Sequence, residues 1–114
     1  MRSPTILIPH ILRNSNGKPL ARTRIAKLLY LIDLSWLELY NHTLTGLPYE
    51  YHRDGPYCNE IEAALWSLED EGAVLPYHGA SSCEAMQYQL EKEDACQPLD
   101  DVEQKVLNLS LIHI

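Results

Sequence analysis

The sequence has few of the residues and patterns that would support a disulfide framework, a metal centre or a membrane anchor. Its 114 residues include three cysteines, at positions 58, 83 and 96, and their wide spacing predicts neither disulfides nor a zinc site. A reducing, cytoplasmic setting is therefore expected. No apolar run approaches the roughly 18 residues that span a bilayer. Pro9 and His10 interrupt the apolar patch at Ile6–Ile8, so we also expect no secretory signal.

Acidic residues are absent before Asp33, and basic residues are scarce after it. The first part carries only basic charges, at Arg2, Arg13, Lys18, Arg22, Arg24 and Lys27, whereas the 16 acids that follow meet only Arg53, Lys92 and Lys105. This polarity fits either two solvated faces of opposite sign or a basic end that meets nucleic acid or an acidic partner. Because the net charge is −7, most of the surface repels phosphates, and we expect no avid nucleic-acid binding.

The sequence also lacks the residue spacings that are typical of catalytic sites. The five histidines never stand at the spacings that helical metal ligands use, and the adjacent acid pairs diverge around a helix instead of converging on a cleft. Gly-rich phosphate loops and the Gly-x-Ser-x-Gly motif do not occur. Cys58 lies near His52 in sequence, but a structural cysteine explains it better than a nucleophile does. We therefore predict a protein that is not an enzyme, with no catalytic residues, metal or cofactor.

The apolar spacing predicts a single α+β domain that is mainly helical. Helices are expected at Pro9–Asn14, from Thr23 to about Tyr40, from Asn59 to Gly72, and after Pro98. The second is apolar nearly all round, which is typical of a buried helix, so it should form the central post of the fold. In the last two helices, capping boxes are expected at Asn59/Glu62 and Asp100/Glu103. The expected inward faces are Ile61, Ala64, Leu65 and Leu68 in one helix, and Val102, Val106 and Leu107 in the other.

Strands are expected on both sides of the third helix. The alternating segment Leu47–Arg53 should be extended and lead into a turn at Asp54-Gly55-Pro56, where Pro56 should prevent ladder pairing. Ala73–Tyr77 and Met86–Glu91 should form a β-hairpin around residues 78–82. A hairpin directly after a helix gives the compact helical domain a winged-helix-like order. The tip of that hairpin carries no Lys or Arg, which argues against a wing that reads DNA.

Aromatic and polar side chains gather around the Gly55-Pro56 turn. They are Tyr49, Tyr51, His52, Arg53 and Tyr57. Tyr and Arg dominate interaction hot spots, and two interpretations stay open. The tyrosines either cover the long helix with their hydroxyls in water, or they contact a partner, as loop residues often do.

Four segments together resemble the Panacea family, also called SocA-like antitoxins and formerly a domain of unknown function. They are the Lys27–Asp33 segment (Lys-Leu-Leu-Tyr-Leu-Ile-Asp), Thr45-Gly46, Asp54-Gly55-Pro56 and Glu71-Gly72. Their order and spacing, more than any one motif, carry the resemblance, which covers about residues 7–107. Asp54 replaces the aromatic residue that usually precedes Gly-Pro in the family.

The resemblance implies a bacterial or phage antitoxin that binds and neutralises a cognate toxin protein encoded beside it. The namesake of the family also acts as a proteolytic adaptor that delivers its toxin to a AAA+ protease, so such a protease is a further expected partner. Toxin contact is expected at Tyr51, Arg53, Gly55, Pro56 and Tyr57, and the acidic helix that follows could complement a basic toxin. Lys27, Tyr30 and Asp33 are expected as scaffold or groove residues.

The C-terminal segment 109–114, Leu-Ser-Leu-Ile-His-Ile, is expected to be a non-native tail. It looks like the translated end of a transposon adapter used in sequencing libraries. Family members usually continue beyond the last expected helix, so we expect a single domain over residues 1–108 that is truncated at its C-terminus. The alternative is a native apolar C-terminus that packs as the end of the helix.

A winged-helix transcriptional regulator is the alternative function. The helix–helix–hairpin order and the basic N-terminal third favour it, and it predicts salt-dependent promoter binding that substitutions of Arg22 and Arg24 weaken. The overall acidity and the hairpin tip without Lys or Arg favour the antitoxin instead. We therefore expect a protein-binding module that occludes a toxin surface.

Overall fold

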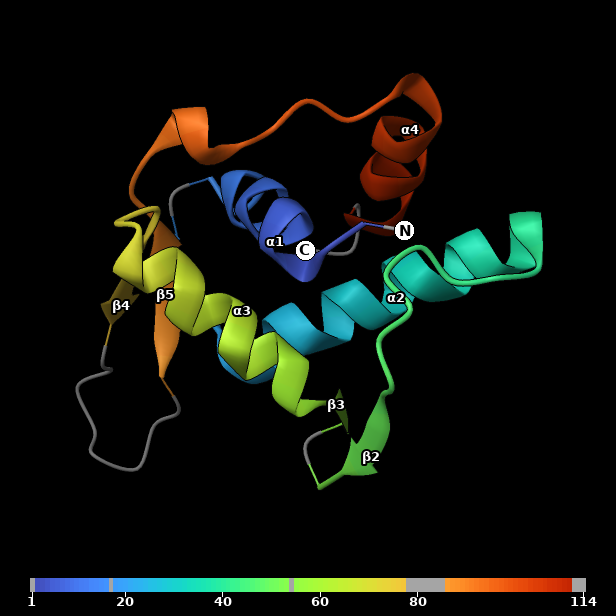
Figure 1. Ribbon diagram of the computed structural model, residues 1–114, viewed down its shortest axis with the longest axis horizontal. Helices are drawn as coiled ribbons and strands as arrows, with labels where there is room; N and C mark the ends of the chain where they lie inside the picture. The colour runs from blue at the N-terminus through green and yellow to red at the C-terminus, as the bar shows by residue number, and fades with distance from the viewer. Residues whose placement is uncertain (1, 17, 54, 78–85, 112–114) are drawn as a thin grey trace.

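The computed structural model describes residues 2–16, 18–53, 55–77 and 86–111 (Figure 1). The elements follow in the order α1 (Pro4–Arg13), β1 (Leu20–Ala21), α2 (Arg22–Tyr40), β2 (Glu50–His52), β3 (Gly55–Tyr57), α3 (Asn59–Asp70), β4 (Val74–Tyr77), β5 (Gln87–Leu90), the 3-10 helix η1 (Glu93–Ala95) and α4 (Asp101–Ser110). Helices dominate the described part of the chain, which confirms the predicted α+β, mainly helical fold.

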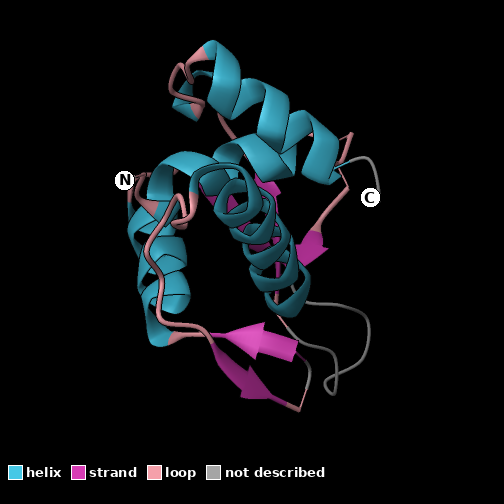
Figure 2. Ribbon diagram, turned by 90° about the vertical axis from the view of Figure 1, so that its right-hand side faces the viewer, coloured by secondary structure: helices cyan, strands magenta, loops and turns pink. Residues whose placement is uncertain are grey.

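Two small antiparallel sheets accompany the helices (Figure 2). β4 and β5 form the predicted hairpin, with Val74 opposite Leu90, while the loop expected at 78–82 lies outside the described residues. β1 pairs with β5 as a third strand. A strand between the first two helices that pairs with the hairpin after α3 is the arrangement of a winged helix, which confirms the predicted order. Sequence reasoning misses β1 because two residues are too few to show alternation.

The first helix begins earlier than the sequence predicts. Ser3 is its N-cap and accepts a hydrogen bond from the Thr5 amide, while Pro4 takes the first helical position that we predicted for Pro9. Pro9 instead lies inside the helix, where it lacks the N–H that would bond the Thr5 carbonyl. Tertiary contacts offset this loss, because residues 7–12 are all buried and α1 packs against α2, α3 and β5.

A larger share of α1 than of α2 is therefore buried, and the prediction that α2 is buried nearly all round is wrong. All the buried residues of α2, among them Ile25, Leu29 and Ile32, lie before Leu34. Its last turns leave Leu37 exposed and Leu39 62% exposed. The reason is length, since the 19-residue α2 extends well beyond the 10-residue α1 against which it packs.

The inward face of α3 is the one that the sequence predicts. It consists of Ile61, Ala64, Leu65 and Leu68. The helix also ends as expected, before Gly72, whose φ of +75° is favourable only for glycine. Its start differs from the prediction. Cys58 is the N-cap and makes no side-chain capping bond, so the capping box at Asn59 does not form, because Asn59 already occupies the first helical position.

The start of α4 confirms the second predicted capping box. Asp100 accepts from the Glu103 amide at 2.8 Å, and the Glu103 carboxylate accepts from the Asp100 amide at 3.0 Å. The inward face differs from the prediction, because Val102 is 44% exposed and Glu103 is buried. The Arg2 guanidinium donates two hydrogen bonds to the Glu103 carboxylate, at 2.5 and 2.8 Å. This pairing allows the carboxylate to be buried and lowers its pKa.

The described part of the expected tail belongs to the folded structure. Ser110 is the last residue of α4, and its hydroxyl donates to the Ser35 hydroxyl at 3.3 Å. Leu111 packs into the hydrophobic core. The single domain over residues 1–108, its truncation and the non-native origin of the tail stay predictions.

Candidate functional site

The β2–β3 hairpin carries most of the residues predicted for toxin contact. Its register places Tyr51 opposite Pro56 and His52 opposite Gly55, while Asp54 lies outside the described residues. The prediction that Pro56 prevents pairing is wrong, because a proline is tolerated in an edge strand and both strands of this ladder are edges. Gly55 has a φ of +115° and open space around the position of a Cβ. Its backbone angle, and not crowding, therefore requires glycine.

A buried carboxylate holds the segment that leads into this hairpin. Asp33 on α2 is 2% exposed and accepts from the amides of Leu44 and Thr45 at 3.0 Å each. It also accepts from the Thr45 hydroxyl at 2.5 Å and from the Tyr49 hydroxyl at 2.7 Å. Burial and the Asp33 carboxylate both raise the pKa of Tyr49, which keeps its hydroxyl a donor. These four bonds fasten residues 44–49 to α2.

A row of tyrosines connects this carboxylate with the surface. The Tyr30 ring lies edge-on to Tyr49, with centroids 5.2 Å apart, and to Tyr51, with centroids 6.3 Å apart. The hydroxyls of Tyr30 and Tyr51 are 3.3 Å apart. Tyr49 and Tyr51 differ in exposure, and contact of Tyr51 with a partner stays a prediction. Tyr49 covers α2 and bonds to protein instead of water, whereas Tyr51 is 80% exposed.

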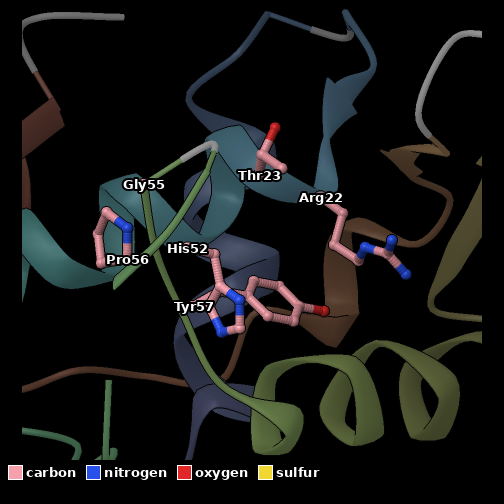
Figure 3. Close-up of a pocket in the computed structure, with 6 residues that line it drawn as sticks. All are labelled: Arg22, Thr23, His52, Gly55, Pro56 and Tyr57. Carbon is pink, nitrogen blue, oxygen red and sulfur yellow. The ribbon is translucent and has the colours of Figure 1, made fainter. Parts of the chain in front are cut away.

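A cavity of about 170 Å³ opens between this hairpin and the N-terminus of α2 (Figure 3). It is lined by Arg22, Thr23, His52, Gly55, Pro56 and Tyr57. The Arg22 guanidinium carbon lies 5.7 Å from the centroid of the Tyr57 ring, and the His52 ring lies edge-on to the same ring. The Tyr57 hydroxyl is buried with no hydrogen-bond partner among the described residues, and burial raises its pKa to about 12. The cavity thus combines an aromatic wall with a cationic rim.

The remaining predicted site residues lie around this hairpin. Arg53 follows β2 and is exposed. Lys27 is exposed on α2, one turn before Tyr30, so both stand on the same side of that helix. Asp33, by contrast, is buried and bonds to residues 44–49, and the role of these three residues as scaffold or groove stays a prediction. The structure thus brings Tyr51, Gly55, Pro56 and Tyr57 together, with Tyr30 behind them.

Sequence reasoning misses two residues of the cavity, Arg22 and Thr23, and it places His52 near the Gly55-Pro56 turn without predicting toxin contact for it. Arg22 and Thr23 stand roughly thirty positions before the hairpin, and no periodicity connects two segments so far apart. The basic character of the first part of the chain contained a signal for Arg22. Its closeness to Tyr57 follows only from the packing of α2 on β3.

Cys58, which follows directly on β3, is buried in the hydrophobic core. Burial raises the pKa of the Cys58 thiol, which is the opposite of what a cysteine nucleophile requires. Within the residues that the structure describes, no group of three His, Cys, Asp or Glu side chains could hold a metal ion. Over the same residues, no helix is long and apolar enough to cross a bilayer.

Comparison with protein families supports the resemblance found in the sequence. Residues 25–112 match the family described as antitoxin SocA-like, Panacea domain. The matched region includes the Lys27–Asp33 segment, the Thr45-Gly46 pair and the whole β2–β3 hairpin. Comparisons with curated proteins and with solved structures give no match. Because the match spans most of the chain and includes the whole β2–β3 hairpin of the site, this protein belongs to the SocA-like antitoxin, Panacea domain family.

Proposed function

We propose that this protein is a cytoplasmic antitoxin that neutralises a cognate toxin by binding it directly. Two observations carry this proposal: family membership, and the surface of the β2–β3 hairpin around the exposed Tyr51. This hairpin surface consists of Tyr51, Gly55, Pro56 and Tyr57. An 80% exposed tyrosine beside a partly aromatic cavity has the composition of an interaction hot spot. A toxin covered at this surface would lose access to its own target.

Each part of the hairpin surface has a distinct physical task in this proposal. Tyr51 supplies apolar area at low entropic cost, because only two side-chain torsions become fixed on binding. The cavity accepts a side chain of the toxin beside Arg22 and Tyr57, where the guanidinium favours a carboxylate or a carbonyl oxygen. The bonds from Asp33 hold residues 44–49 before the toxin arrives, so little ordering is needed on binding.

Co-expression with small neighbouring reading frames tests this function. A neighbour that cannot be cloned alone, but is tolerated beside this gene and co-purifies with the protein, is the expected result. Tyr51→Ala should then weaken the complex about tenfold or more. Tyr40→Ala is the matched control, since Tyr40 is also exposed but lies at the far end of α2. A harmless neighbour that does not co-purify would contradict the proposal.

DNA binding finds less support, although the fold has the strand order of a winged helix. The helix that would enter the major groove is α3, and its sequence contains four acids and no Lys or Arg. Such a surface repels phosphates. Delivery of the toxin to a AAA+ protease is a further step that the same co-expression strain would test, by comparing toxin half-life with and without the antitoxin.

A further inference from the structure

The outer face of α3 has an unusual composition for a surface with no partner. Trp66 is 58% exposed there. Helical spacing places Glu62, Glu69 and Asp70 around it, at positions i−4, i+3 and i+4. Glu69 and Asp70 are exposed, and Glu62 is half-buried. An indole is thus surrounded by three carboxylates on one helix face.

The position of α3 in the fold is also relevant to the kind of partner that this face binds. In DNA-binding winged-helix proteins, the helix that precedes the wing hairpin is inserted into the major groove. In this protein that helix is α3, which precedes the β4–β5 hairpin. Here it is exposed in the same position, beside β4 (Figure 1). Its charge has the wrong sign for phosphates, but it has the right sign for a cationic protein surface.

We propose that the outer face of α3 docks a basic segment of a protein partner. A Lys or Arg side chain of that segment lies over the Trp66 indole, where the ring quadrupole attracts it, and the carboxylates of Glu69 and Asp70 accept its hydrogen bonds. Under the proposed function, on which this inference rests, the segment belongs to the toxin. Exposed tryptophan is among the commonest hot-spot residues at interfaces, which fits a central role for Trp66.

This face is continuous with the hairpin surface. The Glu62 carboxylate accepts a hydrogen bond from the Arg22 guanidinium at 3.3 Å, and Arg22 lines the cavity beside Tyr57. A partner that covers both regions would therefore meet one uninterrupted surface, with the aromatic hairpin at one end and the acidic helix at the other. The basic segment is predicted to contact only the acidic end.

A titration with a defined probe tests the docking chemistry. The probe is a fluorescein-labelled, 16-residue amphipathic peptide of Arg, Leu and Ala, and its analogue with Glu in place of Arg is the negative control. Fluorescence anisotropy at low salt gives the Kd. We expect the Arg peptide to bind, the Glu analogue not to bind, and both Trp66→Ala and the double variant Glu69→Gln/Asp70→Asn to raise the Kd about tenfold.

A matched variant separates docking on α3 from general attraction to an acidic protein. Glu38→Gln/Asp101→Asn also removes two exposed negative charges, but on α2 and α4, and it should change the Kd less than about twofold. In a Trp36→Phe background Trp66 is the only tryptophan, so its emission should change when the Arg peptide binds. Equal weakening by the two double variants, or an unchanged Trp66 emission, would overturn the inference.

The toxin complex distinguishes failure of the inference from failure of the proposed function. If a toxin co-purifies equally well with the wild type and with Trp66→Ala, the antitoxin function holds and docking on α3 is wrong. If no neighbouring toxin binds, while the Arg peptide still requires Trp66, the antitoxin proposal fails and the docking chemistry of α3 stands. Circular dichroism of each variant confirms that it is folded.

Discussion

At the scale of single residues, Asp33 is distinguished by the four hydrogen bonds that its buried carboxylate accepts. Its carboxylate accepts hydrogen bonds from two backbone amides and two hydroxyls, which would otherwise have no partner after folding removes water from them. An ionised acceptor in a protected position makes strong hydrogen bonds, and donors left without it are costly. The aspartate that ends the Lys27–Asp33 segment therefore has a structural explanation, and so does the threonine of Thr45-Gly46.

Replacing Asp33 tests this arrangement. Asp33→Asn keeps the shape but presents an NH₂ group to donors, so we expect the free energy of unfolding to fall by roughly 2–4 kcal/mol. Tyr49→Phe removes one of the four bonds and should cost about 1 kcal/mol. Urea unfolding of both variants measures these differences. A Tyr49→Phe variant that is as unstable as Asp33→Asn would show that the bonds do not act separately.

The Arg2–Glu103 pair gives a prediction for pH. Bonding to Arg2 lowers the pKa of Glu103 in the folded protein below its unfolded value of about 4.3. The pair therefore adds stability above that pH, and the contribution is lost as the pH falls through the folded pKa. Glu103→Gln keeps a capping-box residue but cannot titrate. The wild type should be more stable than this variant at pH 7, and the difference should shrink in urea unfolding at pH 4 and 3.

At the scale of elements, the two ends of α2 have different roles. Its first half lies in the core with α1, while its second half carries leucines at the surface. The same helix therefore contains apolar residues that stabilise the fold and others that contribute little. Periodicity alone does not distinguish the two groups, because both belong to the same apolar pattern.

Substitutions of two leucines in α2 measure this difference between its ends in terms of stability. Leu29 is fully buried, so Leu29→Ala should lower the free energy of unfolding by about 2–5 kcal/mol through lost burial and a residual cavity. Leu39 is 62% exposed, and Leu39→Ala should change it by no more than about 0.5 kcal/mol. Thermal or urea unfolding gives both values. A large effect at Leu39 would mean that this end of α2 is covered in solution, for instance by a second copy.

At the scale of the whole molecule, the chain has the strand order of a winged helix but a net negative charge, which does not favour binding to phosphates. The net charge is −7, and the acids of α3 lie where a DNA-binding member needs cations. The fold and the function are therefore separate questions for this protein. Under the proposed function, the acids of α3 favour a protein partner over DNA.

A gel-shift experiment checks this distinction. Random-sequence duplex DNA at low salt should give no shift with micromolar protein, because α3 offers no cation to replace the counterions on phosphates. Substituting Arg22 and Arg24 should leave this result unchanged. A shift that disappears as salt is raised, and that these substitutions weaken, would instead support the alternative function of a transcriptional regulator.

The sequence by itself determined the features that depend on neighbours within a few residues. The inward face of α3 and the capping box at Asp100 rest on short spacings. The two strands of the β4–β5 hairpin and the family pattern rest on several such local segments and their order along the chain. Helix periodicity and capping act over three or four positions, so they can be recognised before the chain is folded.

Only the tertiary structure decided which distant segments meet. Arg2 pairs with Glu103 across 101 positions, β1 finds β5, and Arg22 reaches the hairpin that contains Tyr57. Contacts of this kind depend on how whole elements pack, and their partners leave no local pattern. For the same physical reason, the sequence indicated a polar aromatic surface around Gly55-Pro56, but the cavity between this surface and the N-terminus of α2 became evident only from the fold.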